Sequence, residues 1–351
     1  HNSKLDRVLV IITLGLYLFY VSYVSKRTKY VDNISFSNFE RSLGSLVFAV
    51  VIATIVHNYI LQPFVIPTGS LEKTLRVGDF LLVSKFHYGA RVPSTVISFP
   101  MVHDTIPILK TRSYLKEPQL PYIRIPGFQE IKNNDIVVFN WPADTVRKFF
   151  VKEKGVIKPR DKKSNYVKRA IGVPGDSLEI KDGIVYLNGQ ENKLPERAKP
   201  LYTYKIFSKD GVSSSKLKNL EIDGFIRKFI IRNLSQESYN SLKANILSIS
   251  NTNENEYLIY TDDQGIPIKK VRELNIDIRE IIDNERELSL TFNDANKIRN
   301  SNEFDTIFRS IEKTNYMNSV FFPGNKRFNW NNDQLGPIYI PKAGEKIKLT
   351  I

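Results

Sequence analysis

Two apolar stretches near the N-terminus constrain this chain more than any other feature. They cover residues 8–24 and 43–61 and contain almost no charged side chains. At about 1.5 Å per helical residue, about 17 to 20 residues cross the hydrocarbon core of a bilayer. We therefore expect transmembrane segments over 1–24 and 43–61. A cleaved signal peptide is the alternative for the first stretch, and a buried helix of a soluble domain is the alternative for the second.

The loop between the two stretches predicts their orientation. Residues 25–42 contain four Lys or Arg against two Asp or Glu. Short loops with an excess of Lys and Arg stay on the cytoplasmic side of the membrane. We therefore expect the loop 25–42 in the cytoplasm and everything after residue 61 outside it.

Composition excludes several classes of chemistry. The chain has no cysteine and only four histidines, so disulfides, thiolate nucleophiles and cysteine zinc sites are excluded. No nucleophile elbow accompanies a histidine, so a hydrolase built from this chain needs another base. The net charge of +14 is not gathered into basic runs interleaved with aromatic residues, and we expect no nucleic acid partner. We also expect no metal or organic cofactor.

The region after residue 61 consists of short alternating segments separated by Pro and Gly, which is typical of β structure. The dipeptide Asp182-Gly183 between two apolar alternations strongly favours a hairpin. We expect a mainly β domain over 62–199. Its predicted strands are residues 80–83, 135–139, 166–173, 177–180 and 184–187.

Residues 200–320 differ in composition from the segment before them. They are rich in Asn, Lys, Ser and Glu and include helix-compatible stretches at 237–247 and 295–313. We expect an α+β insertion or second lobe there, followed by a return to the β core over 321–351.

Ser70 lies in an informative setting shortly after the second apolar stretch. Gly69 permits a tight backbone path beside it, and Pro63 and Pro67 stiffen the approach. A lone serine carries little information, but this one would stand a few residues beyond the membrane. The position predicts a nucleophile near the bilayer surface.

Two segments resemble motifs of the type I signal peptidases. Residues 63–79 resemble the serine box of that family, P-[ST]-x-S-M-x-x-T-L-x-x-G-D. Residues 166–176 resemble its lysine box, Y-[IV]-K-R-x-[IV]-G-x-P-G-D, and 135–139 resemble the box between them. The resemblance covers roughly residues 1–190. It implies a mainly β catalytic domain anchored by two N-terminal transmembrane helices, with the α+β segment as an insertion.

The resemblance assigns roles to particular residues. It implies that Ser70 is the nucleophile, that Lys168 is the general base, and that the oxyanion is held by the Ser70 backbone N–H and the Thr68 hydroxyl. Lys168 must be neutral to accept a proton, and burial among apolar groups favours that form. The implied substrate pocket is shallow and apolar, and it comprises Phe64, Ile66, Pro67, Leu71, Leu75, Tyr166 and Val167.

Strand alternation makes a prediction about the surroundings of Lys168. Successive side chains of a strand point to opposite faces, so Tyr166 and Lys168 should share one face. Arg169 should lie on the other face and point to solvent.

The chain departs from the family pattern at three places. Leu71 stands where Met is usual, and Lys73 stands where Pro is often found. The later box of the family, G-D-N-R-x-N-S-x-D-S-R, is absent up to Ile351. We expect that box beyond Ile351 in a C-terminally truncated, long-insert bacterial form; a degenerate copy is the alternative.

The resemblance implies a serine endopeptidase that removes signal peptides from exported preproteins. It would be a multi-pass protein of the bacterial cytoplasmic membrane, with its catalytic domain facing the periplasm or exterior. The expected partners are preproteins, the lipid bilayer and the secretion translocon. Two alternatives are a membrane-anchored β scaffold that only binds, and a penicillin-binding or β-lactamase-like enzyme. The second alternative uses Ser70 and Lys73 as an S-x-x-K motif, which requires both residues on one helix.

Overall fold

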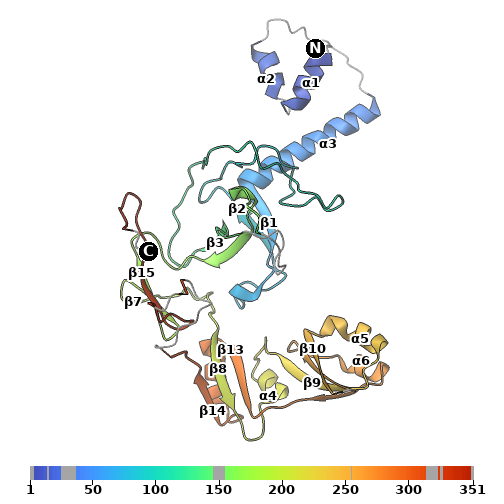
Figure 1. Ribbon diagram of the computed structural model, residues 1–351, viewed down its shortest axis with the longest axis vertical. Coiled ribbons are helices and arrows are strands. Elements are labelled where there is room, and N and C mark those ends of the chain that lie inside the picture. The colour runs from blue at the N-terminus through green and yellow to red at the C-terminus, as the bar shows by residue number, and fades with distance from the viewer. Residues whose placement is uncertain are drawn as a thin grey trace. The chain divides into compact units, whose positions relative to one another are not determined.

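The computed structural model describes residues 4–13, 16–24, 37–144, 155–253, 255–313, 323–324 and 327–348. The chain divides into two compact units (Figure 1). The first unit comprises His1–Pro67 and Gly78–Ala170, and the second comprises Thr68–Val77 and Ile171–Ile351.

The first unit begins with two short helices in place of one long span. They are α1 (Lys4–Ile12) and α2 (Leu16–Tyr23). The hydroxyl of Thr13 donates to the Leu9 carbonyl at 2.7 Å and accepts a hydrogen bond from the Tyr17 N–H at 3.0 Å. The side chain thus takes the Tyr17 N–H, which in a continuous helix would donate to the Thr13 carbonyl. Within the described residues only one helix is long and apolar enough to cross a membrane, and it is neither of these. The first of the two expected transmembrane segments is therefore not confirmed.

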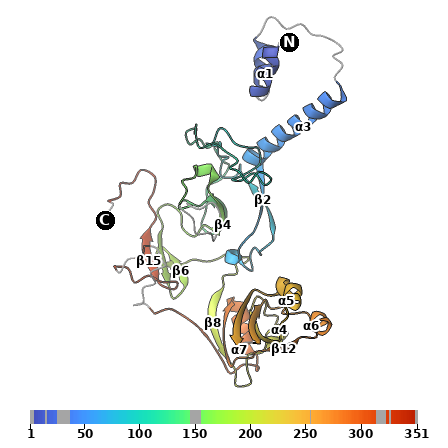
Figure 2. The same ribbon diagram turned by 45° about the vertical axis from the view of Figure 1, so that its right-hand side comes forward.

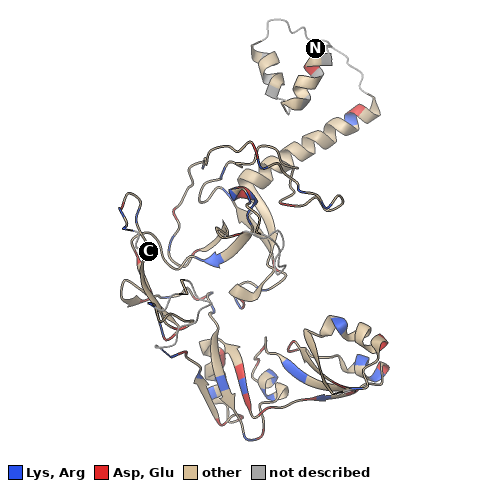
Figure 3. Ribbon diagram, viewed as in Figure 1, with Lys and Arg blue, Asp and Glu red and all other residues tan. Residues whose placement is uncertain are grey.

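Helix α3 (Asn38–Ile55) is the helix that meets this criterion. Ser37 and Glu40 form a capping box at its start, which explains why it begins before the predicted residue 43. A π-helical turn, Val56–Ile60, extends it to a span of 23 residues, within which an 18-residue stretch has a mean hydropathy of 1.9. Figure 3 shows charged residues only at its N-terminal end. A helix with the length and composition of a membrane span is therefore present where the second span is predicted, and its crossing of a membrane stays a prediction. Most of the predicted loop 25–42, namely 25–36, lies outside the described residues.

Two antiparallel strand pairs follow the span in the first unit. Strand β1 (Leu61–Val65) follows the π-helical turn directly and pairs with β2 (Phe80–Ser84). Strand β3 (Ile136–Asn140) pairs with β4 (Asn165–Arg169). These strands confirm the predictions at 80–83 and 135–139.

The predicted strand 166–173 is too long, because β4 ends at Arg169. In the second unit, the N–H of Val173 donates to the Asp176 carboxylate at 2.9 Å, and the N–H of Asp176 donates to the Val173 carbonyl at 3.0 Å. Gly175 between them has a φ of +99°, which favours glycine. The apolar residues of this stretch therefore belong to a turn.

A long irregular segment, residues 85–132, joins β2 to β3 and is called here the hairpin loop. Four isolated antiparallel bridges hold its two arms together: Arg91 with Arg124, Thr95 with Gln119, Ser98 with Tyr114, and Thr105 with Arg112. The hairpin loop lies beside the C-terminal part of α3 in both views (Figures 1 and 2).

The second unit contains a four-stranded antiparallel sheet in the order β15-β5-β6-β7. Its strands are β5 (Ser177–Lys181), β6 (Ile184–Leu187), β7 (Gln190–Glu191) and β15 (Leu335–Tyr339). Asp182 and Gly183 have φ values of +48° and +72° between β5 and β6, as expected for a tight hairpin turn. The predicted hairpin is confirmed.

Two further antiparallel sheets follow in the second unit, each with helices and its own core. The first sheet has the order β13-β8-β14 and comprises β8 (Tyr202–Phe207), β13 (Glu285–Leu290) and β14 (Thr306–Arg309), with α4 (Ser214–Asn219) and α7 (Phe292–Asn300). The second has the order β10-β11-β9-β12 and comprises β9 (Arg227–Arg232), β10 (Ser248–Asn253), β11 (Glu256–Thr261) and β12 (Asp277–Glu280), with α5 (Gln236–Leu242) and α6 (Ile268–Glu273).

The buried centres of these two sheets are separate. One core includes Ile206, Leu217 and Ile298, and the other includes Ile231 and Ile259; all five are at most 1% exposed. The helix-compatible stretch 295–313 is wrong in its second half, because α7 ends at Asn300 and β14 follows. The described part of the chain is therefore mainly β, as predicted.

Candidate active site

Ser70 lies on a short exposed turn between β1 and β2. Residues Gly69–Leu71 form one 3₁₀ turn, which the Glu72 N–H closes on the Gly69 carbonyl at 2.9 Å. Thr68 precedes the turn in an extended conformation, and both Thr68 and Ser70 are exposed. A Cβ on Gly69 would lie 2.7 Å from the Glu72 carboxylate, the flexible end of a side chain that can move aside, so this turn does not itself require glycine.

Lys73 does not have the geometry that the S-x-x-K alternative needs. The 3₁₀ turn ends at Leu71, and Lys73 has a φ of +66°, so Ser70 and Lys73 do not share a helix. The Lys73 ammonium forms an ion pair with Asp223. A proline, whose φ is fixed near −65°, cannot adopt this backbone conformation. Lysine in place of the family's frequent proline therefore allows a backbone conformation at residue 73 that proline could not adopt.

Lys168 is the next-to-last residue of β4, lies opposite Val137 of β3, and is half-buried. Its Nζ lies 5.7 Å from the ring centroid of Tyr166, so the two side chains share a face, as alternation predicts. Tyr166 in turn contacts Trp141, at 5.3 Å between ring centroids, and Phe139, at 6.4 Å. The lysine amine thus lies over one edge of an aromatic cluster.

Arg169 corrects the prediction for the opposite face of β4. It is half-buried rather than fully solvated, and its guanidinium donates to the Asn134 carbonyl at 2.7 Å. This bond ties β4 to the turn before β3. Arg169 therefore helps to hold the strand that carries Lys168.

The other candidate residues divide between the two units. Phe64, Ile66, Pro67, Tyr166 and Val167 belong to the first unit with Lys168, whereas Leu71 and Leu75 belong to the second with Thr68 and Ser70. Ile66 is 3% exposed, Pro67 is exposed, and the remaining pocket candidates are half-buried. The joining of Ser70 with Lys168 in one site stays a prediction.

An ion pair that the sequence did not reveal supports the start of β4. The Asp144 carboxylate lies 3.2 Å from Lys158 Nζ and accepts the Ser164 N–H at 2.6 Å. The side chains of Lys158 and Asp144 are 3% and 0% exposed. The two residues belong to no motif, so no signal in the sequence marks them. Among the described residues, no group of three or more His, Asp or Glu side chains is placed to hold a metal ion.

A comparison with protein families identifies the chain. Residues 40–258, well over half of the chain, match the family described as signal peptidase, peptidase S26. The chain belongs to this signal peptidase family. The matched region includes both Ser70 and Lys168, the residues that the two boxes mark.

Curated relatives agree with the family. The chain is 31% identical to signal peptidase I of Rickettsia massiliae (strain Mtu5) over 175 residues. These aligned residues cover 50% of each of the two chains. It is 30% identical over 188 residues to signal peptidase I of Rickettsia prowazekii (strain Madrid E), covering 53% of this chain and 56% of the relative. The chain thus matches about half the length of these relatives. No solved structure matches it.

Proposed function

We propose that this protein is a membrane-bound serine endopeptidase that cleaves N-terminal signal peptides from exported preproteins. The observation that carries the proposal is the family match, which spans both the turn with Ser70 and the strand with Lys168. The position of Lys168 on the same face of β4 as Tyr166 supports the proposal, because the lysine box places both residues at the site.

The proposed reaction has two stages. The Oγ of Ser70 attacks the scissile carbonyl carbon while its proton passes to the neutral Nζ of Lys168. The resulting oxyanion accepts hydrogen bonds from the Ser70 N–H and the Thr68 hydroxyl. The C–N bond then breaks, Lys168 returns the proton to the leaving amine, and an ester on Ser70 remains. A water molecule hydrolyses this ester after giving a proton to Lys168, which finally returns it to Ser70.

The exposed position of Ser70 suits an extended peptide as substrate. The proposed pocket accepts small side chains before the cleaved bond and is built from Phe64, Ile66, Pro67, Leu71, Leu75, Tyr166 and Val167. Small apolar residues suit this pocket because its side chains are largely apolar.

The proposed setting is the bacterial cytoplasmic membrane. Helix α3 crosses it, residues 1–24 form a second crossing, and the catalytic domain faces the periplasm or exterior. The lipid bilayer and the secretion translocon are the proposed partners besides the preproteins. Within the exported part, we propose a catalytic core over 62–199, an insertion over 200–320 and a return to the core over 321–351.

Alanine variants test the catalytic assignment. We expect Ser70→Ala and Lys168→Ala each to reduce kcat/KM for a preprotein at least about a thousandfold, because each removes half of the nucleophile–base pair. Lys73→Ala is the matched control and should stay within a few-fold of the unchanged protein. The measurement is cleavage of a preprotein in detergent micelles. Loss of cleavage from Lys73→Ala alone would favour the S-x-x-K enzyme, and equal cleavage by all variants would leave only a binding scaffold.

A further inference from the structure

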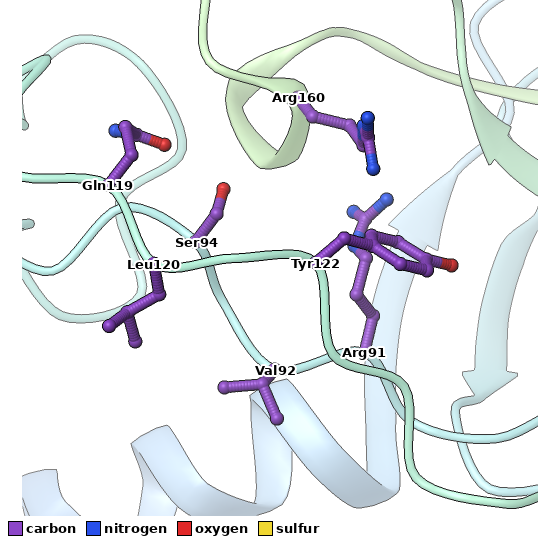
Figure 4. Close-up of a pocket in the computed structure, with 7 residues that line it drawn as sticks. All are labelled: Arg91, Val92, Ser94, Gln119, Leu120, Tyr122 and Arg160. Carbon is purple, nitrogen blue, oxygen red and sulfur yellow. The ribbon is translucent and has the colours of Figure 1, made fainter.

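Three arginine side chains of the first unit gather around the ring of Tyr122. The Arg160 guanidinium lies 4.8 Å from the ring centroid and that of Arg124 lies 6.0 Å from it. Arg124 Nε also donates to the Tyr122 hydroxyl at 2.8 Å. Arg91, whose backbone pairs with Arg124, completes the group, and Figure 4 shows its guanidinium directed toward that of Arg160 beside the ring.

Three of these side chains, Arg91, Arg160 and Tyr122, line a pocket of about 190 Å³ between the hairpin loop and Arg160, and Arg124 lies beside it on the Tyr122 ring. Ser94 and Gln119 add polar groups to its wall, and Val92 and Leu120 add apolar ones. The pocket therefore combines guanidinium groups with an apolar side. That combination suits a ligand that is anionic at one end and hydrocarbon at the other.

The positive charge of the pocket is not neutralised within the described residues. Asp161 is the nearby carboxylate, and its two oxygens accept hydrogen bonds from the hydroxyls of Ser94 and Thr95, each at 2.8 Å, and from the Thr95 N–H at 3.1 Å. No described carboxylate forms an ion pair with any of the three arginines. Three positive groups therefore face one negative group.

The electrostatics of Arg91 express this imbalance. Burial lowers the pKa of Arg91, the charge of Asp161 opposes that effect, and the neighbouring Arg124 and Arg160 add to it. Positive charges held close together raise the free energy of the folded chain unless an anion binds between them. A phosphate group matches the planar, forked donors of arginine well.

The hairpin loop, which carries most of the pocket, begins at the end of the candidate membrane span. The Lys85 N–H donates to the carbonyl of Ile60, the last residue of that span, at 2.9 Å, and the hairpin loop begins there. The hairpin loop exposes large apolar side chains along its length, among them Phe99 (54% exposed), Ile108 (90%), Leu109 (66%) and Phe128 (82%). Exposed apolar groups interleaved with basic ones are typical of segments that lie in the headgroup region of a bilayer.

We propose that the pocket lined by Arg91, Arg160 and Tyr122, with Arg124 beside it, binds the phosphate of an anionic membrane phospholipid. The phosphate accepts hydrogen bonds from the guanidinium groups, and Val92 and Leu120 contact the carbon atoms next to it. Binding fixes the hairpin loop at the membrane surface beside the end of α3. The proposal is independent of the catalytic roles of Ser70 and Lys168, and a failure of either leaves the other intact.

Native mass spectrometry of the delipidated full chain in a non-ionic detergent tests this site. The probes are phosphatidylglycerol, a diacylglycerol with the same acyl chains but no phosphate, and inorganic phosphate. We expect one phosphatidylglycerol to be retained with at least about tenfold higher affinity than either of the others. Equal retention of diacylglycerol would overturn the proposal in favour of apolar contact alone. Binding of inorganic phosphate as strong as that of the lipid would overturn the lipid assignment.

Matched variants locate the binding. Arg160→Gln should weaken phosphatidylglycerol binding at least about tenfold, and the double variant R91Q/R160Q should weaken it further. Arg160→Gln should fold, because Arg160 is exposed and its loss leaves no described carboxylate without a partner. The double variant also removes the bond from Arg91 to Asn140 Oδ1, so its thermal unfolding is measured beside that of the single variant. Arg112→Gln is the control: Arg112 also stacks on a tyrosine of the hairpin loop, Tyr114, at 5.6 Å, but lies outside the pocket. Equal loss in R112Q and R160Q, or no loss in the double variant, would refute the site.

Discussion

At the scale of single residues, backbone conformation and distant partners separate the candidate lysines. Lys73 has a positive φ and an ion-pair partner, Asp223, far along the sequence, whereas Lys168 lies in a regular strand against Tyr166. The family motif and strand alternation were enough to predict that Tyr166 and Lys168 share a face. They could not predict the environment of Arg169, because its partner, the Asn134 carbonyl, lies 35 residues earlier in the chain, in the turn before β3.

The buried ion pair between Asp144 and Lys158 leads to a stability prediction. Asp144→Asn should lower the free energy of unfolding by about 3–5 kcal/mol, because it leaves the buried Lys158 ammonium without its countercharge. Denaturant unfolding in detergent, followed by Trp141 fluorescence in a Trp330→Phe background, measures the change. The control is Glu273→Gln, which removes the exposed pair with Lys269 and should cost less than about 1 kcal/mol. Equal effects of the two substitutions would contradict the structural role of the buried pair.

At the scale of elements, signals between residues close in sequence were sufficient to predict a strand pair and a helix. The turn Asp182-Gly183 predicted the hairpin of β5 and β6, and the apolar run after residue 43 predicted α3. The hairpin loop had no such signal. Its arms are joined by isolated bridges and not by continuous strands, so the sequence shows no regular alternation of apolar and polar residues there. The pocket in it depends on residues such as Arg91 and Arg160, which only the fold brings together.

The junction between α3 and β2 leads to a prediction about pH. Lys85 follows β2 directly, and burial, helped by the charge of Arg91, lowers its pKa from 10.5 to about 8. Between pH 8 and 10.5 the unfolded chain therefore binds more protons at this site than the folded chain, and stability rises with pH across that window. The contribution is at most about 3 kcal/mol, and solvent screening of the partly exposed amine reduces it.

Replacing Lys85 by methionine tests this assignment. Lys85→Met should remove the rise in stability between pH 8 and 10.5 and should make the protein more stable than the unchanged chain at pH 7. Thermal unfolding of both chains across this range measures the difference, which cancels the titration of all other groups. Lys269→Met, at an exposed helical position, should leave the pH profile unchanged. A parallel profile for Lys85→Met and the unchanged chain would contradict the lowered pKa.

At the scale of the whole molecule, composition and the two boxes were sufficient to predict the family and a mainly β fold. They predicted an α+β segment over residues 200–320 but not the arrangement of its sheets, because that stretch carries no motif. The structure shows that the chain enters the two additional sheets through β8 and leaves through β14, which pair with one another. The N–H of Ser310 donates to the Thr203 carbonyl at 2.9 Å, so the two ends of the segment are adjacent.

Adjacent ends and two closed cores predict that residues 200–310 fold when separated from the rest. Each sheet buries its apolar face within this segment, with Leu217 and Ile298 in one core and Ile231 and Leu242 in the other. We expect the isolated segment to unfold cooperatively and to give dispersed amide resonances. Leu217→Ala should destabilise it by about 2–5 kcal/mol, because Leu217 is fully buried. Leu247→Ala, at an exposed position, is the control and should change stability by less than about 1 kcal/mol. A disordered segment would instead mean that these sheets require the remainder of the second unit, and the insertion proposed for residues 200–320 would then be an integral part of the fold.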